Sequence, residues 1–251
     1  MSKNKHLYFL HIPKTSGTKM QSDILAASQS TNKVKVYIPG DFEFVFNPEI
    51  ADSYNIICGH FARNPIGVIS GLTTFSMIRE PFDQYVSSAK YAAVQSGIDF
   101  NEEFLDSFLS NDNEFSTQFD GMSGCENPQS CFLFSKIACI EHQSFMDSYG
   151  NLFTSRYQSF FVEKPKSYSE LSERLDGIII GTVENRSFFV ERINKILFSL
   201  YGIRMTNNDL IINSTPKPAF KISKKHKSNI LEKIELDIEL YAKIKELEHE
   251  I

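Results

Sequence analysis

Five short apolar runs constrain the fold of this chain more than any other feature. They cover residues 6–12, 33–39, 54–60, 73–80 and 177–182. Each run has the length of a strand. The runs at 6–12 and 54–60 are typical of buried strands, whereas 33–39 alternates like a half-exposed strand. Segments with helical spacing follow near Thr18, at Pro81 and over 183–202. This alternation predicts one α/β domain over residues 1–251, with a central parallel sheet flanked by helices.

The middle and the tail are organised differently. Residues 100–165 are less regular, with predicted helices at 101–110 and 131–146. The tail, 224–251, is predicted to form one long charged helix with an apolar stripe. Such a stripe packs on its own domain or pairs with a second copy as a homodimer, and the spacing does not distinguish the two. The stripe comprises Ile230, Ile234, Ile238, Tyr241 and Ile244.

Charge and cysteine content exclude several classes of function. The net charge of −5 gives no basic excess for binding nucleic acid. Cys58, Cys125, Cys131 and Cys139 lack the paired spacing of metal ligands, so we expect no metal site and free thiols in a reducing compartment. No apolar run has the length of a signal peptide or a membrane span, so we expect a cytoplasmic protein without a membrane partner.

The segment HIPKTSGT, residues 11–18, carries the features of an anion-binding loop. Its position between a strand and a helix would direct successive backbone N–H groups toward an anion. Gly17 allows close approach of the backbone and Lys14 supplies a positive charge. The Gly-Lys-Ser/Thr order of triphosphate-binding loops is absent, which disfavours a nucleoside triphosphate with its metal. An ordinary polar turn is the alternative. The hydroxyl donors are those of Thr15, Ser16 and Thr18.

A second polar cluster follows the run at 73–80. Arg79 ends that run, and Ser87 lies eight residues later, close to one face of the predicted helix. Arginine offers a bidentate fork that suits a phosphate. Alone, Arg79 would serve equally well in a salt bridge or a helix cap near Glu80 and Asp83. Together with the loop, it favours a second phosphate subsite.

These motifs resemble those of sulfotransferases that use 3′-phosphoadenosine 5′-phosphosulfate (PAPS). The likeness rests on HIPKTSGT, on Gly59-His60-Phe61, and on Arg79-Glu80-Pro81 with Ser87. It is greatest to the branch of bacterial sulfotransferases and heparan-sulfate 2-O-sulfotransferases. NLFTSRY (151–157), GTVENRSFFVERI (181–193) and NSTPK (213–217) also look like segments of that family. The resemblance implies a P-loop-like three-layer fold.

The resemblance also implies where the donor binds. Residues 14–18 would hold the 5′-phosphosulfate, and Arg79 with Ser87 would hold the 3′-phosphate. Thr215 and Lys217 would lie near the same nucleotide. Many relatives carry a second arginine where this chain has Gln84, so the 3′ subsite or the acceptor side is expected to differ.

The expected reaction needs a group to stabilise charge and a base, and it needs no metal. Lys14 would stabilise charge on the departing phosphate oxygen, leaving adenosine 3′,5′-bisphosphate (PAP) as product. His60 matches the family's catalytic histidine and would take the acceptor's proton. The alternative for His60 is a strand-end histidine satisfied by a backbone carbonyl. His11 and His142 are interpreted as structural, and Glu184 as a cap, a sheet-edge contact or a reserve base.

The acceptor side is assigned to the insertion at about 100–165. Its aromatic and acidic residues, and its few basic ones, favour a small-molecule metabolite or a weakly charged saccharide sulfated on a hydroxyl. An amine or guanidinium acceptor stays open. Two other functions remain alternatives: a small-molecule kinase that uses ATP and magnesium, and a nucleotide-binding protein without catalytic activity.

Overall fold

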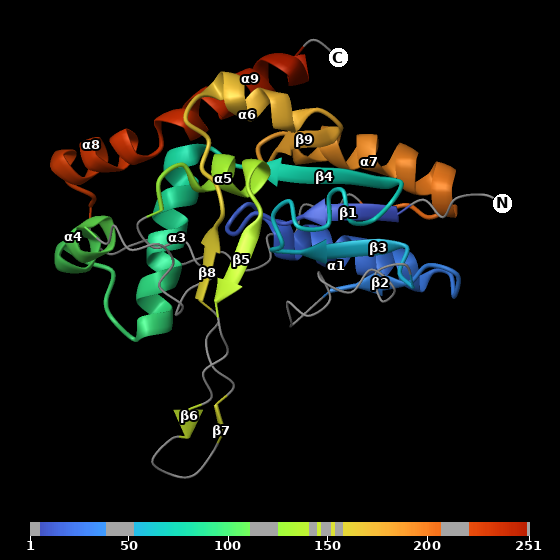
Figure 1. Ribbon diagram of the computed structural model, residues 1–251, viewed down its shortest axis with the longest axis horizontal. Coiled ribbons are helices and arrows are strands. Elements are labelled where there is room, and N and C mark those ends of the chain that lie inside the picture. The colour runs from blue at the N-terminus through green and yellow to red at the C-terminus, as the bar shows by residue number, and fades with distance from the viewer. Residues whose placement is uncertain are drawn as a thin grey trace.

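A five-stranded parallel sheet forms the centre of the molecule (Figure 1). The computed structural model describes residues 6–38, 53–110, 125–140, 145–146, 152–153, 158–206 and 221–249. The strand order is β2–β3–β1–β4–β9, and each neighbouring pair runs parallel. The predicted parallel α/β architecture is therefore confirmed. The strands are β1 (His6–Leu10), β2 (Val36–Tyr37), β3 (Ile56–Gly59), β4 (Leu72–Ile78) and β9 (Ile178–Thr182).

The central strand β1 shows why the sheet needs cover on both faces. Successive side chains of a strand point to opposite faces. Leu7 and Phe9 accordingly join one hydrophobic cluster, whereas Tyr8 and Leu10 join another. All four side chains are fully buried or nearly so. Because the apolar side chains of β1 are buried on both faces, the sheet lies between two layers of helices.

Helices α1 (Gly17–Gln29) and α7 (Arg186–Tyr201) cover the face to which Leu7 and Phe9 point. Each helix contributes apolar residues three or four positions apart, which lie on one side of an α-helix. Gly202 ends α7 in the left-handed conformation, with φ of 71°, as a glycine after a helix commonly does. The buried contributors include Met20, Ile24, Phe189, Ile193 and Leu197.

Helices α5 (Pro128–Phe134), α6 (Tyr168–Leu175) and α9 (Glu235–His249) cover the opposite face. Figure 1 shows α6 and α9 beside each other at the top of the view. Leu171 of α6 and Leu240 of α9 are fully buried in this layer. The layer therefore joins residues from the middle of the chain to its C-terminal part.

A third cluster lies beyond the carboxyl ends of the strands. It joins α3 (Pro81–Ser96), α4 (Glu102–Ser110) and α8 (Lys224–Lys233) around Tyr85, Phe108 and Ile230. The buried ring of His226 adds a polar tie, because its Nε2 lies 3.0 Å from the carboxylate of Asp106. This cluster fixes α3, which begins directly after β4, at the end of the sheet where ligands of such folds bind.

The prediction of a helix over 131–146 is wrong. Helix α5 ends at Phe134, where Ser135 takes an extended conformation with φ of −99° and ψ of 165°. Strand β5 (Ile137–Ile140) follows and pairs antiparallel with β8 (Gln158–Phe161). The remote partner strand supplies the hydrogen bonds, and local spacing gives no sign of it. A further short pair joins β6 (Phe145–Met146) to β7 (Leu152–Phe153).

The prediction of one C-terminal helix over 224–251 is also wrong, because the helix breaks at Ile234. Asn127 accounts for the break. Its backbone N–H donates to the carbonyl of Lys233 at 2.8 Å. Its side-chain oxygen accepts from the N–H groups of Leu236 and Asp237 at 2.8 and 3.1 Å. One residue thus satisfies both the end of α8 and the start of α9.

The apolar stripe of this tail packs mainly on the chain's own core. Ile230, Ile234 and Ile244 are buried, whereas Ile238 is 40% exposed. The homodimer stays a prediction. Within the described ranges, no helix combines the length and the apolar character that crossing a bilayer requires.

Buried Asp237 makes the stability of the fold depend on pH. Its carboxylate accepts from the N–H groups of Gln129 and Ser130 at 3.0 and 2.7 Å, and from the Ser130 hydroxyl at 2.6 Å. Burial raises the pKa of Asp237 to about 6, although these hydrogen bonds act in the opposite direction. The Asp237 carboxyl group therefore keeps its proton up to a higher pH in the folded state than in the unfolded chain.

We expect Asp237→Asn to remove a stability change between pH 4 and 7. A raised carboxyl pKa stabilises the fold below the unfolded pKa, and this contribution of about 3 kcal/mol is lost as pH rises through 6. Urea unfolding at several pH values measures the free energy of unfolding of both proteins. The difference in the free energy of unfolding between the wild type and Asp237→Asn should change by about 3 kcal/mol over this pH range. A difference that does not change with pH would show that Asp237 does not have a raised pKa.

Candidate functional site

Three predicted segments follow adjacent strands, so they meet at one edge of the sheet. Strand β1 pairs with β3 on one side and with β4 on the other. The pairing continues past the strands: the His11 N–H donates to the Gly59 carbonyl at 3.0 Å. On the other side, still within the strands, the Ser76 hydroxyl donates to the carbonyl of Leu10, the last residue of β1, at 2.8 Å. The loop after β1 therefore lies between the segments that contain His60 and Arg79.

The loop after β1 has an unusual backbone. Lys14 and Ser16 have φ values of 65° and 59°, in the left-handed region that non-glycine residues seldom adopt. Left-handed residues within a turn bring successive N–H groups to one side, as in anion-binding nests. The loop leads into α1, whose first-turn N–H groups have no partner inside the helix. The side chain of Ser16, the residue before α1, makes no capping hydrogen bond to the start of this helix.

The hydroxyls of the loop point in different directions. Ser16 and Thr18 are exposed, whereas Thr15 is fully buried and its hydroxyl donates to the Ile12 carbonyl at 2.7 Å. Thr15 therefore holds the shape of the loop with its side chain. Any contact of Thr15 with an anion would come from its backbone N–H.

Gly17 is required by the histidine beneath it. A Cβ atom at this position would lie 1.7 Å from Cδ2 of His11 and 1.8 Å from Nε2. No side chain fits while the imidazole stays in place. The close approach expected between the backbone and a ligand thus has a second cause, the packing of the buried His11 ring.

His60 has one ring nitrogen fixed by a hydrogen bond. Its Nδ1 lies 2.8 Å from the backbone carbonyl of His11, and the two rings contact each other at a tilt of 31° with centroids 4.0 Å apart. A carbonyl only accepts, so Nδ1 must carry the hydrogen. In the neutral ring the lone pair then belongs to Nε2. The bond fits both interpretations of His60, because it satisfies a strand-end histidine and also fixes the tautomer that a general base needs.

His11 is kept neutral by its surroundings. Burial lowers its pKa well below the usual range, and the nearby charges of His60 and Lys14 act in the same direction. Its Nδ1 is buried and has no hydrogen-bond partner among the described residues. The interpretation of His11 as a packed residue fits this environment.

Helix α3 packs directly on the loop. The buried Gln84 side chain donates from Nε2 to the Pro13 carbonyl at 3.1 Å. About two turns further along the same face, the Lys14 ammonium lies 4.3 Å from the centre of the Tyr91 ring. Residues 84, 88 and 91 share this helix face. We call these two contacts the loop latch, and they place Lys14 beside the helix that carries Ser87.

Arg79 is held by Gln129, a residue to which no sequence motif points. The Arg79 N–H donates to Oε1 of Gln129 at 2.8 Å, and Nε2 of Gln129 donates to the Arg79 carbonyl at 2.9 Å. Gln129 is buried and its own N–H donates to Asp237. The two residues are 50 positions apart, so no motif connects them. The Arg79 guanidinium remains 32% exposed, 3.7 Å from the carboxylate of Asp83.

The remaining predicted residues divide into placed and undescribed ones. Ser87 is buried on α3, 9% exposed. Glu184 accepts from the Glu80 N–H at 3.1 Å. The pKa of Tyr241 is raised by burial first and then by Glu184, which also accepts its hydrogen bond. These contacts favour a structural role for Glu184. The undescribed residues are Thr215, Lys217 and His142, together with much of the proposed acceptor side.

Among the described residues, no group of three or more histidine, cysteine or acidic side chains is placed to hold a metal ion. Cys58, Cys125 and Cys131 are buried free thiols. Cys139 belongs to β5, and its side chain lies outside what the structure describes.

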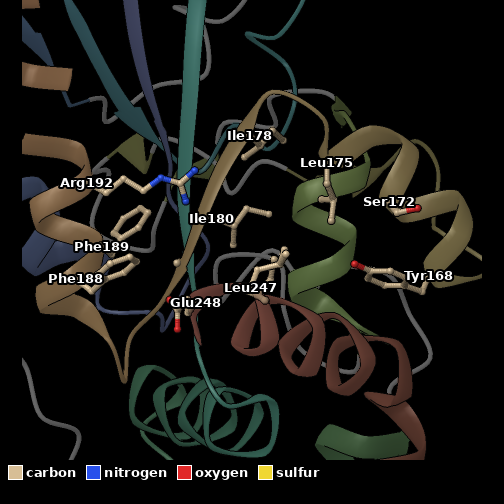
Figure 2. A pocket seen from close by; sticks show the side chains of 12 residues that line it. Tyr168, Ser172, Leu175, Ile178, Ile180, Phe188, Phe189, Arg192, Leu247 and Glu248 are labelled. Carbon is tan, nitrogen blue, oxygen red and sulfur yellow. The ribbon is translucent and has the colours of Figure 1, made fainter. Parts of the chain in front are cut away.

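A cavity of about 240 Å³ lies elsewhere, between α6, β9, α7 and α9 (Figure 2). None of the predicted site residues lines it, and most of its lining side chains are apolar. Glu248, its one acidic residue, is engaged with the N–H and hydroxyl of Thr182, both at 2.8 Å. The cavity is therefore separate from the loop after β1, His60 and Arg79.

Comparison of the sequence with models of known protein families and with curated proteins finds no match in either. The argument for function consequently rests on the residues and their geometry.

We expect Gly17→Ala to destabilise the protein by about 1–3 kcal/mol, the usual cost of overpacking. The added methyl group overlaps the His11 ring. In a His11→Ala background the overlap disappears, so the same substitution should cost much less. Chemical unfolding of the four proteins in this double-mutant cycle measures the coupling. Equal costs in both backgrounds would show that His11 does not restrict residue 17.

Proposed function

We propose that this protein is a PAPS-dependent sulfotransferase. It would move a sulfuryl group from PAPS to a hydroxyl of a small-molecule metabolite or a weakly charged saccharide. The observation that carries the proposal is the loop latch, the packing of residues 13 and 14 on the face of α3 formed by Gln84 and Tyr91. It brings the anion-binding loop next to the helix that begins after Arg79 and carries Ser87.

The donor set suits a nucleotide with charge at both ends. The 5′-phosphosulfate would lie on the loop, held by Lys14, by the N–H groups of residues 15–18 and by the exposed hydroxyls of Ser16 and Thr18. The 3′-phosphate would lie on Arg79 and Ser87, with the Arg79 backbone fixed by Gln129. Thr215 and Lys217 remain proposed contacts to the same nucleotide.

The chemistry requires a base and a cation on opposite sides of the sulfur. The acceptor oxygen would attack sulfur as the bond from sulfur to the phosphate oxygen breaks, and the electron pair of that bond would pass to the phosphate. Lys14 would stabilise this charge. Nε2 of His60, which holds the lone pair in the tautomer fixed by His11, would take the hydroxyl proton. PAP and the sulfated acceptor would be the products.

The nucleotide itself provides the first test. PAP should raise the melting temperature without magnesium, since a ligand that binds only the folded state stabilises it. ATP with magnesium should have little effect, because the loop lacks the triphosphate order. A larger shift with ATP and magnesium would favour the kinase instead.

Arg79→Ala should weaken PAP binding by about 1.5–3 kcal/mol, the usual contribution of a hydrogen bond to a charged group. Calorimetric titration at one fixed salt concentration measures the affinity. Arg192→Ala is the matched control, because Arg192 is an exposed arginine on α7 that lines the separate cavity. Unchanged PAP affinity in the Arg79 variant would disprove the 3′ assignment.

His60→Ala should slow sulfuryl transfer by about 10²–10⁴-fold, the typical contribution of a general base. Its affinity for PAP should stay near that of the wild type, since the proton transfer occurs on the acceptor side. A screen of hydroxyl and amine acceptors with labelled PAPS supplies the assay. Nucleotide binding without transfer to any acceptor would favour the non-catalytic alternative.

A further inference from the structure

The α3 face next to the loop latch carries a second positive charge. Asp83, Ser87 and Lys90 are spaced at i, i+4 and i+7, which places them along one side of the helix. Arg79 precedes the helix, and its guanidinium lies 3.7 Å from Asp83. Ser87 therefore lies between an arginine at the start of this face and a lysine one turn beyond it.

Lys90 packs beside Phe100 rather than extending fully into solvent. It is partly buried, and its ammonium lies 5.9 Å from the centre of the Phe100 ring. Burial lowers the pKa of Lys90, with Arg79 acting in the same direction and Asp83 in the opposite one. Lys90 follows Ser87 by one turn on this side of α3, so the face carries one carboxylate, Asp83, and two cations, Arg79 and Lys90.

Gln84 cannot supply a second positive charge to the proposed 3′-phosphate subsite. Its amide is neutral, fully buried and engaged with the Pro13 carbonyl. A doubly charged phosphate bound by Arg79 and Ser87 alone would keep much of its charge uncompensated. A cation that reaches Ser87 from the other side would complete the subsite.

We propose that Lys90 is the second cation of the 3′-phosphate subsite and binds that phosphate together with Arg79 and Ser87. The inference rests on the proposed function and deepens it. Lysine acts as a flexible point charge and needs no fixed bidentate geometry. Lys90 would therefore make the protein selective for nucleotides that carry a 3′-phosphate.

The test compares two nucleotides that differ only in that phosphate. PAP and adenosine 5′-phosphate are titrated calorimetrically into the wild type, Lys90→Met and Lys90→Arg at one salt concentration. Methionine keeps an apolar stem against Phe100 while it removes the charge. Lys195→Met, an exposed lysine on α7, is the matched control.

Lys90→Met should weaken PAP binding about 10- to 100-fold, as expected for loss of a charge-assisted hydrogen bond. Its affinity for adenosine 5′-phosphate should stay within about twofold of the wild type, which also shows that the variant is folded. Lys90→Arg should recover most of the PAP affinity, and Lys195→Met should bind both nucleotides normally.

The failure of this inference is distinguishable from the failure of the proposed function. If the wild type binds neither nucleotide, the sulfotransferase proposal and this inference both fall. If the wild type binds PAP and Lys90→Met binds it equally well, only the role of Lys90 falls. Equal weakening for both nucleotides would also overturn it, because a contact to the 3′-phosphate must discriminate between them.

Discussion

The parallel pairing of β1 on both of its edges is the constraint on which the rest of the structure depends. Because β1 lies between β3 and β4, three segments far apart in the sequence leave the sheet side by side. The hydrogen bond from His11 to Gly59 extends this order into the loop. His60, the loop after β1 and Arg79 owe their proximity to this pairing, and the helices then fix their orientation.

The strained loop needs packing to hold it. Two non-glycine residues in the left-handed region cost on the order of 1–3 kcal/mol each. Three contacts offset this cost: the buried His11 ring under Gly17, the hydrogen bond from Thr15 to Ile12, and that from Gln84 to Pro13. These contacts hold the shape of the loop without a ligand, so the anion binding that we propose would cost little ordering free energy.

The sequence predicted the parts of the molecule that depend on local chemistry. The buried strands, the start of α3 at Pro81 and the end of α7 at Gly202 follow from apolar runs, proline and glycine. Strand β5 and the break before α9 were missed because β8 and Asn127, remote in the chain, decide them. Gln129 was missed for the same reason.

Burial explains why position 84 holds a neutral residue rather than a charged one. The site is fully buried, and an unpaired guanidinium there would cost far more to desolvate than a neutral amide does. The Gln84 amide also donates to the Pro13 carbonyl in the loop. This contact supports the loop structurally and is not itself a phosphate contact. The chain thus keeps its buried position neutral and structural. The positive charges of this edge are those of Arg79 and Lys90. Both side chains are only partly buried, so desolvating them costs less than it would at position 84.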